Sequence, residues 1–323
     1  MQDQALVAAF LLDGKGAGRP MSWVDIDSWQ PSAGCLWVHL HRDAEETREW
    51  LDKRSGLDAL IVESLLAEST RPRCAPVGDG VMLFLRGVNL NPGADPEDMV
   101  SIRLWVESTR IISVRTRRLM SVDDLRQAFG RGDGPRDAGS FITQLAGQLV
   151  SRMSGVIADV DDDVDRLQEA VLESEDRQLR TDLTRLRREI IALRRYLAPQ
   201  REALARFGQV RTSWINELDS LHIREEADHV MRLVEDLDAA RERAAVTQEE
   251  LNNRLSEQMN ARMYVLSVVA AVFLPLGFLT GLFGINVGGI PLAEDPGGFS
   301  NIVLLLFAIT GALVVLFRWR RWF

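Results

Sequence analysis

Cysteine is scarce in this sequence, and several functional signatures are missing. Cys35 and Cys74 are the only two cysteines and have no CxxC spacing, which argues against a disulfide framework and against a zinc-finger module. The glycine-rich run at residues 14–18 lacks the GKS or GKT ending of a phosphate-binding loop, so we interpret it as a hairpin turn. The sequence shows no paired nucleophile and base, and we therefore do not predict an enzyme.

Positive charge is also in deficit, because the formal net charge is −9 at pH 7. Nucleic acid is not expected as a partner, since binding its phosphates requires a basic surface. An acidic balance suits a protein that handles cations, although it also serves plain solubility. With 46% apolar and 26% charged residues over 323 positions, the chain is a globular protein with room for two domains. Residues 1–14 lack the basic start of a signal peptide, so we expect a strand there.

Charge is absent from residues 263–283, which are almost wholly apolar. This length matches the roughly 20 apolar residues that cross a bilayer as a helix, and residues 299–317 form a second such span. The connection, residues 284–298, has no Lys or Arg and carries Glu294 and Asp295, whereas arginines and tryptophans follow the second span. This asymmetry predicts that both termini are cytoplasmic and that the connection is a periplasmic loop.

Residues 1–130 alternate strand and helix signals and predict a cytoplasmic α/β domain. Asp58 and Ser121 are suitable N-caps for two of the helices, and residues 131–136 form a linker. The predicted strands are residues 5–12, 35–40, 81–90, 99–107 and 110–117, and the predicted short helices are residues 44–53, 58–67 and 121–129.

From residue 138 the apolar residues recur at helical spacing, which predicts helices at 138–174, 178–207 and 213–283. Their charges are acidic, basic and acidic in turn, so we expect neighbouring helices to form a salt-bridged stack. The third helix would be about 105 Å long, which requires partners along its length and indicates an oligomer. A heptad-like seam on it is typical of packing against copies of itself, and consists of Val230, Leu233, Leu237, Ala240 and Ala244.

The predicted fold is therefore an α+β membrane protein. It comprises the cytoplasmic α/β domain at 1–130, a helical stalk at 131–262 and a transmembrane domain at 263–323.

One face of the long helix is small or flexible and uncharged throughout the bilayer. Two interpretations are equally open: a conduit that does not trap a divalent ion, and a face for close helix packing. Counting back from Asn286 in steps of three or four, this face consists of Asn252, Ser256, Met259, Met263, Leu266, Ala270, Leu274, Gly277 and Gly281.

The end of the first span, FLPLGFLTGLFGIN, resembles the signature of the CorA superfamily of divalent-cation transporters, which carry Gly-x-Asn at the outer end of this helix. Ile285 replaces the usual Met, and together with residues 287–291 it resembles the ZntB branch of zinc transporters. The stretches CLWVHL, IRLWVESTRIISVR and YLAPQREALARF also resemble that branch, so the likeness covers nearly the whole chain.

The resemblance implies a funnel-shaped homopentamer in which five copies of the long helix line one pore. Gly284, Ile285 and Asn286 would form the selectivity filter, with the Asn286 ring binding a hydrated metal ion. Gly277 stands where many members carry threonine, so a second polar ring is not implied. Glu294 and Asp295 are substitutes for the outer-loop acid of the family. The family's basic inner collar would fall on Arg318, Arg320 and Arg321, although these arginines by default only anchor the topology.

Several further candidates carry charge or metal-ligand chemistry. His222 and His229 share a helix face and would form rings in an oligomer, whereas an ordinary exposed pair is the simpler interpretation. Cys35, His39 and His41 share a strand face, but we interpret them as part of a core strand rather than a zinc site. The predicted funnel acids, which would attract cations, are Glu217, Asp219, Glu225, Glu226, Asp228, Glu235, Asp236 and Asp238.

These features predict divalent-cation transport across a bacterial-type inner membrane, foremost Zn²⁺ uptake, with proton coupling as an open question. No cofactor is expected, and the partners are copies of the chain, membrane lipid and the transported ion. Transport of Mg²⁺, Co²⁺ or Ni²⁺ is the alternative within the class. A two-span signalling or scaffold protein is the alternative outside it, and the short outer loop, with no room for a sensor domain, counts against that.

Overall fold

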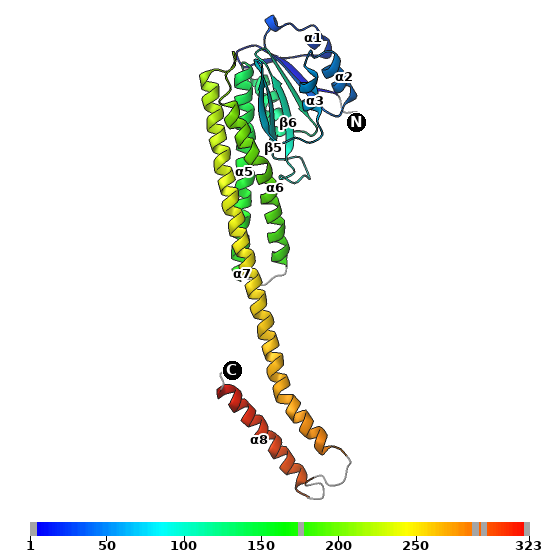
Figure 1. Cartoon of the computed structure of the whole chain (residues 1–323), viewed down its shortest axis with the longest axis vertical. Coiled ribbons are helices and arrows are strands. Elements are labelled where there is room, and N and C mark those ends of the chain that lie inside the picture. Colours follow the sequence, from blue (N-terminus) through cyan, green and yellow to red (C-terminus); the bar gives the residue numbers. More distant parts are fainter. Residues whose placement is uncertain (1–4, 174–177, 286–290, 292–295, 320–323) are drawn as a thin grey trace. The chain divides into compact units, whose positions relative to one another are not determined.

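The protein was analysed as a computed structural model that describes all residues except 1–4, 174–177, 286–290, 292–295 and 320–323. The chain divides into two compact units, residues 1–249 and residues 250–323. The first unit combines a β-sheet with three long helices, and the second contains the end of the longest helix and one further helix (Figure 1). Each unit is described by itself below.

The first unit is built on a seven-stranded sheet with the strand order β2-β1-β3-β7-β6-β5-β4. Strands β3 and β7 are parallel and all other neighbours are antiparallel. The strands are β1 Leu6–Leu12, β2 Gly18–Pro20, β3 Leu36–His41, β4 Arg73–Val77, β5 Gly80–Gly87, β6 Val100–Val106 and β7 Arg110–Arg115.

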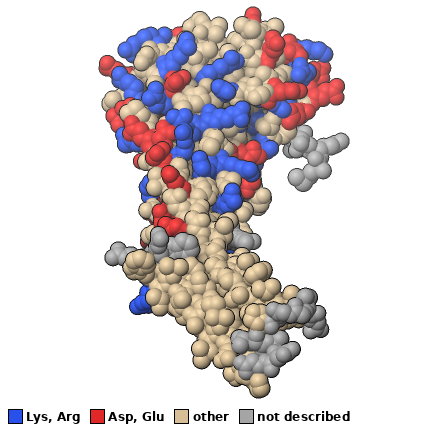
Figure 2. All heavy atoms as spheres, turned by 60° about the horizontal axis from the view of Figure 1, so that its bottom comes forward, with Lys and Arg blue, Asp and Glu red and all other residues tan. Residues whose placement is uncertain are grey.

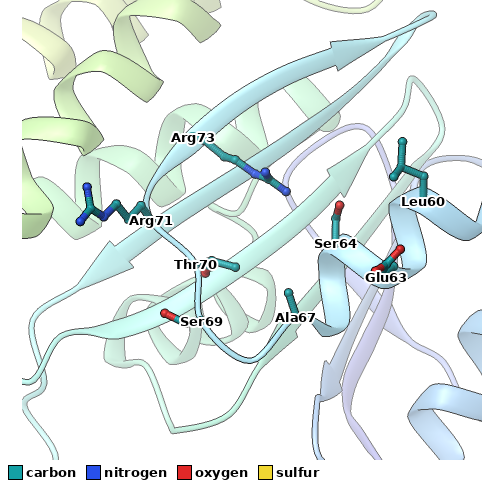
Figure 3. Close-up of a pocket in the computed structure, with 8 residues that line it drawn as sticks. All are labelled: Leu60, Glu63, Ser64, Ala67, Ser69, Thr70, Arg71 and Arg73. Atoms are coloured by element: carbon teal, nitrogen blue, oxygen red, sulfur yellow. The ribbon is translucent and has the colours of Figure 1, made fainter.

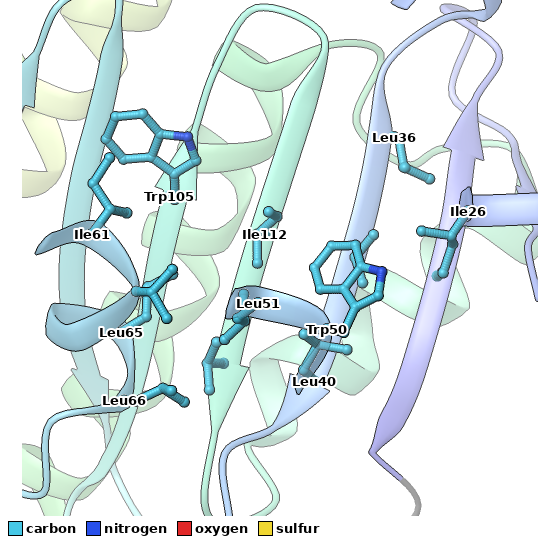
Figure 4. Close-up of a cluster of buried hydrophobic side chains, with 14 of the residues drawn as sticks. Ile26, Leu36, Leu40, Trp50, Leu51, Ile61, Leu65, Leu66, Trp105 and Ile112 are labelled. Atoms are coloured by element: carbon cyan, nitrogen blue, oxygen red, sulfur yellow. The ribbon is translucent and has the colours of Figure 1, made fainter. Parts of the chain in front are cut away.

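One face of the sheet is covered by the short helices α1, Trp23–Asp27, α2, Glu45–Lys53, and α3, Ala59–Leu66 (Figure 4). Trp50 of α2 and Leu65 of α3 are buried there against the strands. Burying such side chains contributes about 1.5–3 kcal/mol each.

The opposite face packs on α4, Met120–Arg131, and α5, Ala138–Glu173, while α6, Gln178–Phe207, contacts β4 and β5. The ring centroid of Trp37 lies 4.9 Å from that of Phe141 in α5 and 5.9 Å from that of Phe129 in α4. Because helices cover both faces, β3 is buried almost throughout, which explains its continuous apolar run in the sequence.

The longest helix, α7, spans Glu217–Phe283, and α8 spans Gly298–Trp319. The predicted start of α7 at residue 213 is wrong by four residues. Ser213 instead donates to Asp79 in the β4–β5 turn, from its backbone nitrogen at 2.9 Å and from Oγ at 2.5 Å. Asn216 then caps the helix by accepting the backbone N–H of Asp219 at 2.8 Å.

The five strands and three short helices predicted for residues 1–130 are confirmed to within a few residues. The Asp58 cap is also confirmed, because its side chain accepts the backbone N–H of Leu60 at 2.8 Å. The Ser121 cap is wrong: α4 follows Leu119, and Ser121 is buried inside its first turn. Helix α1 and strands β2 and β4 were not predicted from the sequence, because α1 and β2 are very short and Pro76 masks the strand signal of β4.

The heptad-like seam of α7 was expected to face copies of the chain, and this is wrong. All five of its residues are buried within a single chain. A heptad pattern identifies the buried face of a helix but not the helices that bury it. Here α5 and α6 of the same chain supply the cover.

The expected salt-bridged stack is confirmed between the basic helix α6 and the acidic start of α7, whereas the acidic run of α5 pairs with α7 and not with α6 in the described ion pairs. Arg243 of α7 pairs with Asp161 and Asp165 of the acidic run in α5, and Arg194 of α6 pairs with Asp238 of α7 at 2.5 Å. The described cross-links therefore join α7 to each of the other two helices. Such partly exposed pairs contribute little to stability, and they define how the helices are turned.

We predict that Gly80→Ala destabilises the protein by about 2 kcal/mol, because the new Cβ would overlap the buried Trp105 ring. Gly155→Ala is the matched control: it lies on exposed α5 surface with open space around it, and we expect a gain of about 0.5–1 kcal/mol from helix propensity. Thermal unfolding of both variants measures the difference. Equal stability of the two variants would contradict the packing described for β5 and β6.

Candidate ion-conduction path

The face of α7 that the sequence singled out is uncovered in the structure. All nine residues from Asn252 to Gly281 that were counted onto it are exposed. The better-covered residues lie about 180° away around the helix, at about 100° per residue. They are Val268, Ala271, Val272, Pro275, Leu276, Leu279 and Phe283.

Helix α8 can pack against the better-covered face of α7, because both helices belong to the same compact unit. It carries a partly covered face of its own at helical spacing, which includes Ile302, Leu306, Ile309 and Leu313. In this unit, the partly covered residues of α7 therefore lie on one side of the helix and the nine exposed residues lie on the other. A free, uncharged side on a membrane helix suits contact with further copies or with a permeating ion.

Both α7 and α8 contain stretches long and apolar enough to cross a membrane. Charged side chains gather over the first unit (Figure 2), whereas the described residues between 263 and 317 in the second unit carry no charge. Exposed leucines, valines and phenylalanines cover both helices, which favours a lipid environment over water.

Gly284 directly follows the last residue of α7 and lies close to the backbone of the final helical turn. Its backbone N–H donates to the carbonyl oxygens of Thr280 at 3.0 Å and Gly281 at 3.2 Å. A Cβ added at Gly284 would lie 3.0 Å from the Thr280 oxygen, a backbone atom that cannot easily move. Glycine therefore lets the chain leave the helix here without a clash.

Of the other residues predicted at the two ends of the membrane segment, the structure describes only some. Ile285 is 49% exposed, and Arg318 is exposed in the last turn of α8. Asn286, Glu294, Asp295, Arg320 and Arg321 lie outside the described residues.

The predicted funnel acids of α7 fall into two groups. Glu217, Glu225, Asp228, Glu235 and Asp236 are exposed and available to a solvent-filled space. The remaining three, which pack against neighbouring elements of the chain, are Asp219, Glu226 and Asp238.

Each of these three carboxylates has a distinct environment. Asp238 binds Arg194, and this hydrogen bond is the main cause that lowers the pKa of Asp238. Burial raises the pKa of Glu226, whose carboxylate lies 4.0 Å from His229. Asp219 is 6% exposed and lies directly against Gly139 in the first turn of α5, and burial raises its pKa. Asp219 is therefore not a funnel acid, because its carboxylate points into the chain's own packing.

Two further exposed acids were missed. Glu242 and Glu249 follow Asp228 and Glu235 at seven-residue intervals, and all four are exposed. The same heptad spacing that identified the buried seam would have found them on the opposite side.

The histidines and cysteines considered as metal ligands lie in separate environments and not in one site. His229 Nε2 lies 3.2 Å from Ser154 Oγ of α5, and His222 is exposed. His39 is fully buried with Nδ1 2.7 Å from Ser113 Oγ, and burial lowers its pKa well below the ordinary value. Burial also raises the pKa of the Cys35 thiol to about 12, which leaves it a poor metal ligand at neutral pH. Among the described residues, no group of three or more His, Cys, Asp or Glu side chains could hold a metal.

The candidate path along α7 therefore offers a cation only uncharged groups, which would contact it weakly. The exposed face carries small or flexible uncharged side chains within the membrane segment, and amide, hydroxyl and thioether groups precede them on α7. Such a surface does not replace the hydration shell of a divalent cation, and a narrow apolar stretch can close by losing its water.

Comparison with known proteins supplies the identity. A model of the CorA-like Mg²⁺ transporter protein family matches residues 32–321. The divalent cation transporter CmaX of Pseudomonas aeruginosa is 39% identical, with 99% of this chain and 97% of that protein covered. The zinc transport protein ZntB of Pectobacterium carotovorum is 35% identical, with 100% and 97% covered.

Solved structures agree on the fold. The full-length CmaX structure matches with a TM-score of 0.86 and 38% identity, covering 100% of this chain and 99% of that one. The CorA magnesium transporter of Methanocaldococcus jannaschii matches with a TM-score of 0.82 over 98% of both chains, at 17% identity. These relatives are ion transporters and not enzymes. The chain belongs to the CorA-like family of divalent-cation transporters.

Proposed function

We propose that the chain forms a homopentamer in a bacterial inner membrane and takes up Zn²⁺ through one central pore. The exposed, uncharged face of α7 carries this proposal. The opposite face is better covered, and α8 of the same unit can pack against that opposite face. Five such faces turned toward one axis make a closed conduit. The relatives named as zinc transporters, which match along the full chain, support zinc as the ion.

The filter is a ring of five Asn286 side chains at the outer end of the pore. An amide oxygen accepts hydrogen bonds from the hydration water of a cation and adds no net charge, so that the ion is selected and then released. Gly284 and Ile285 shape the backbone below this ring. Glu294 and Asp295 in the outer loop add a negative field that concentrates cations at the entrance.

The conduit below the filter is apolar and acts as the gate. Leu274, Leu266 and Met263 narrow it, and an apolar constriction of this kind stops conduction when it loses water. The helices open it by moving apart, which rehydrates the constriction. No charged side chain on α7 between residues 263 and 283 opposes or traps the ion.

The cytoplasmic part of the path is negative. Asp228, Glu235, Glu242 and Glu249 form one exposed heptad row on α7, which attracts cations toward the cytoplasmic mouth without coordinating them. Both termini are cytoplasmic, and Arg318, Arg320 and Arg321 form a basic collar at the inner end of the membrane segment.

We predict that Asn286→Ala lowers Zn²⁺ flux into reconstituted liposomes by about tenfold, equivalent to ~1.4 kcal/mol of lost ion stabilisation at the filter. Asn301→Ala removes an exposed amide from the first turns of α8 and is the matched control with unchanged flux. Unchanged flux in Asn286→Ala contradicts the filter. Mg²⁺, Co²⁺ and Ni²⁺ measured in parallel, with and without a pH gradient, identify the ion and the driving force.

We predict that the triple variant Asp228→Asn, Glu235→Gln, Glu242→Gln lowers flux several-fold at low ionic strength. The difference should vanish near 0.5 M salt, since exposed charges beyond about 10 Å are already screened at 0.1 M. Neutralising Asp159, Asp162 and Glu169 on exposed α5 surface removes the same charge and is the control. An equal effect of both triple variants would point to total charge rather than to the α7 row.

We predict that Gly284→Ala reduces flux more than Gly311→Ala, although both add one methyl group to the membrane domain. The Gly284 methyl would lie 3.0 Å from the Thr280 carbonyl, whereas the space around Gly311 is open. The strain shifts the backbone directly before the filter. Flux assays on both variants at equal protein content make the comparison, and equal activity would show that the filter tolerates this shift.

A further inference from the structure

A polar hollow of about 300 Å³ lies in the first unit, between the end of α3 and strands β5 and β6. Four guanidinium groups and two hydroxyl groups line it: Arg42, Arg86, Ser101, Arg103, Thr116 and Arg117. Three acidic residues, Asp43, Glu68 and Asp98, line the same hollow.

The two innermost arginines come from neighbouring strands and project from the same face of the sheet. Arg86 of β5 pairs in register with Ser101 of β6, and Arg103 follows two residues further along β6. Arg103 donates to the Leu65 carbonyl at 2.7 Å, and Arg86 donates to the carbonyls of Met99 and Thr70. These bonds fix both guanidinium groups at the wall of the hollow.

Neither of these two arginines contacts a carboxylate within the described part of the chain. Two of the acids that line the same hollow pair with its other two arginines: Asp43 binds Arg42 and Asp98 binds Arg117. Glu68 is exposed and offers Arg42 and Arg103 its backbone carbonyl.

The two inner arginines therefore lack a direct carboxylate partner, although Asp98 acts on Arg86 and Asp43 acts on Arg103 at longer range. Arg103 is 3% exposed, and burial, followed by the charges of Arg42 and Arg86, lowers its pKa to about 10. The Nε atom of Arg86 is buried and has no hydrogen-bond acceptor among the described residues. Buried guanidinium groups are normally paired with an anion, so this arrangement lacks its counter-charge.

We propose that the hollow binds the phosphate group of a small soluble molecule, with Arg86 and Arg103 as its charged contacts and Ser101 as a hydroxyl donor. Guanidinium groups present planar pairs of N–H donors that match the oxygens of a phosphate group. Inorganic phosphate and the phosphates of a nucleotide share this chemistry, and they differ in size.

A second hollow, of about 400 Å³, is lined by residues between Leu60 and Arg73 and does not offer the same arrangement. Arg71 and Arg73 point in opposite directions there (Figure 3), and Arg73 lies over the Phe84 ring at 4.7 Å. The convergence of Arg86 and Arg103 thus distinguishes the first hollow.

Arg86 also connects the hollow to the long helices. Its guanidinium lies over the Tyr196 ring of α6 at 4.0 Å, and its backbone N–H donates to Gln200 Oε1 at 2.7 Å. A phosphate bound at Arg86 thus contacts a residue that is held by α6, so that ligand binding stiffens the junction between sheet and stalk.

The test is the thermal midpoint of the purified full-length protein in phosphate, in ATP and in chloride at equal ionic strength. We expect phosphate or ATP, well above its dissociation constant, to raise the midpoint by about 3 °C relative to chloride. A larger effect of ATP than of phosphate assigns the site to nucleotides, and the reverse assigns it to inorganic phosphate.

Ser101→Asp is the decisive variant, because Arg86→Gln also removes the contact with α6 and risks misfolding. An aspartate opposite Arg86 supplies the missing negative charge, so we expect a raised midpoint in chloride and no response to phosphate or ATP. Arg188→Gln, an exposed position on α6, is the control that keeps the response. The proposal is overturned if neither anion shifts the wild-type midpoint, or if Ser101→Asp responds as the wild type does.

Discussion

The burial of one side of α7 against helices of its own chain is the constraint on which the rest of the molecule depends. Val230, Leu237 and Ala244 are fully buried, so this side cannot serve another purpose without the loss of core packing. Burial is worth about 25 cal/mol per Å² of apolar surface, and turning the helix would cost several kcal/mol. The packing therefore fixes the direction of the opposite side, where Asp228 and Glu235 project into solvent.

The same helix meets a different requirement beyond residue 262, where water no longer satisfies its backbone. A helix can cross a bilayer because its backbone hydrogen bonds are made within the helix. Pro275 lies inside α7 and removes one of these bonds, because proline has no N–H. Proline cannot donate to the carbonyl of Ala271, four residues earlier. Both residues belong to the better-covered face, so the unpaired carbonyl lies away from the exposed, uncharged face of α7. The uncovered face keeps an unbroken backbone.

Periodicity predicted the long helices, the two membrane spans and the five principal strands, because each leaves a repeating apolar pattern in the sequence. It did not reveal which partner covers each face. The α7 seam was assigned to copies of the chain, and Asp219 was counted with acids that face solvent. Gly139 of α5 lies against Asp219 across 80 positions of sequence, and no local pattern records such a contact. The exposure of the uncharged face of α7 was predictable, because its small or flexible uncharged residues recur at helical spacing.

A transporter must also release its ion, and the charges of α7 lie on a different part of the helix from its exposed, uncharged face, an arrangement that suits this requirement. A site of nanomolar affinity that binds at about 10⁹ M⁻¹s⁻¹ releases its ion only about once per second. Carboxylates or imidazoles inside the narrow path would produce such a site, since they replace the water around the metal. Carboxylates on the exposed side of the stalk instead act through solvent, where their field raises the local concentration of cations without direct coordination. In the proposed pore, the acids of the stalk would attract the cation, and the uncharged membrane stretch would let it pass without binding it tightly.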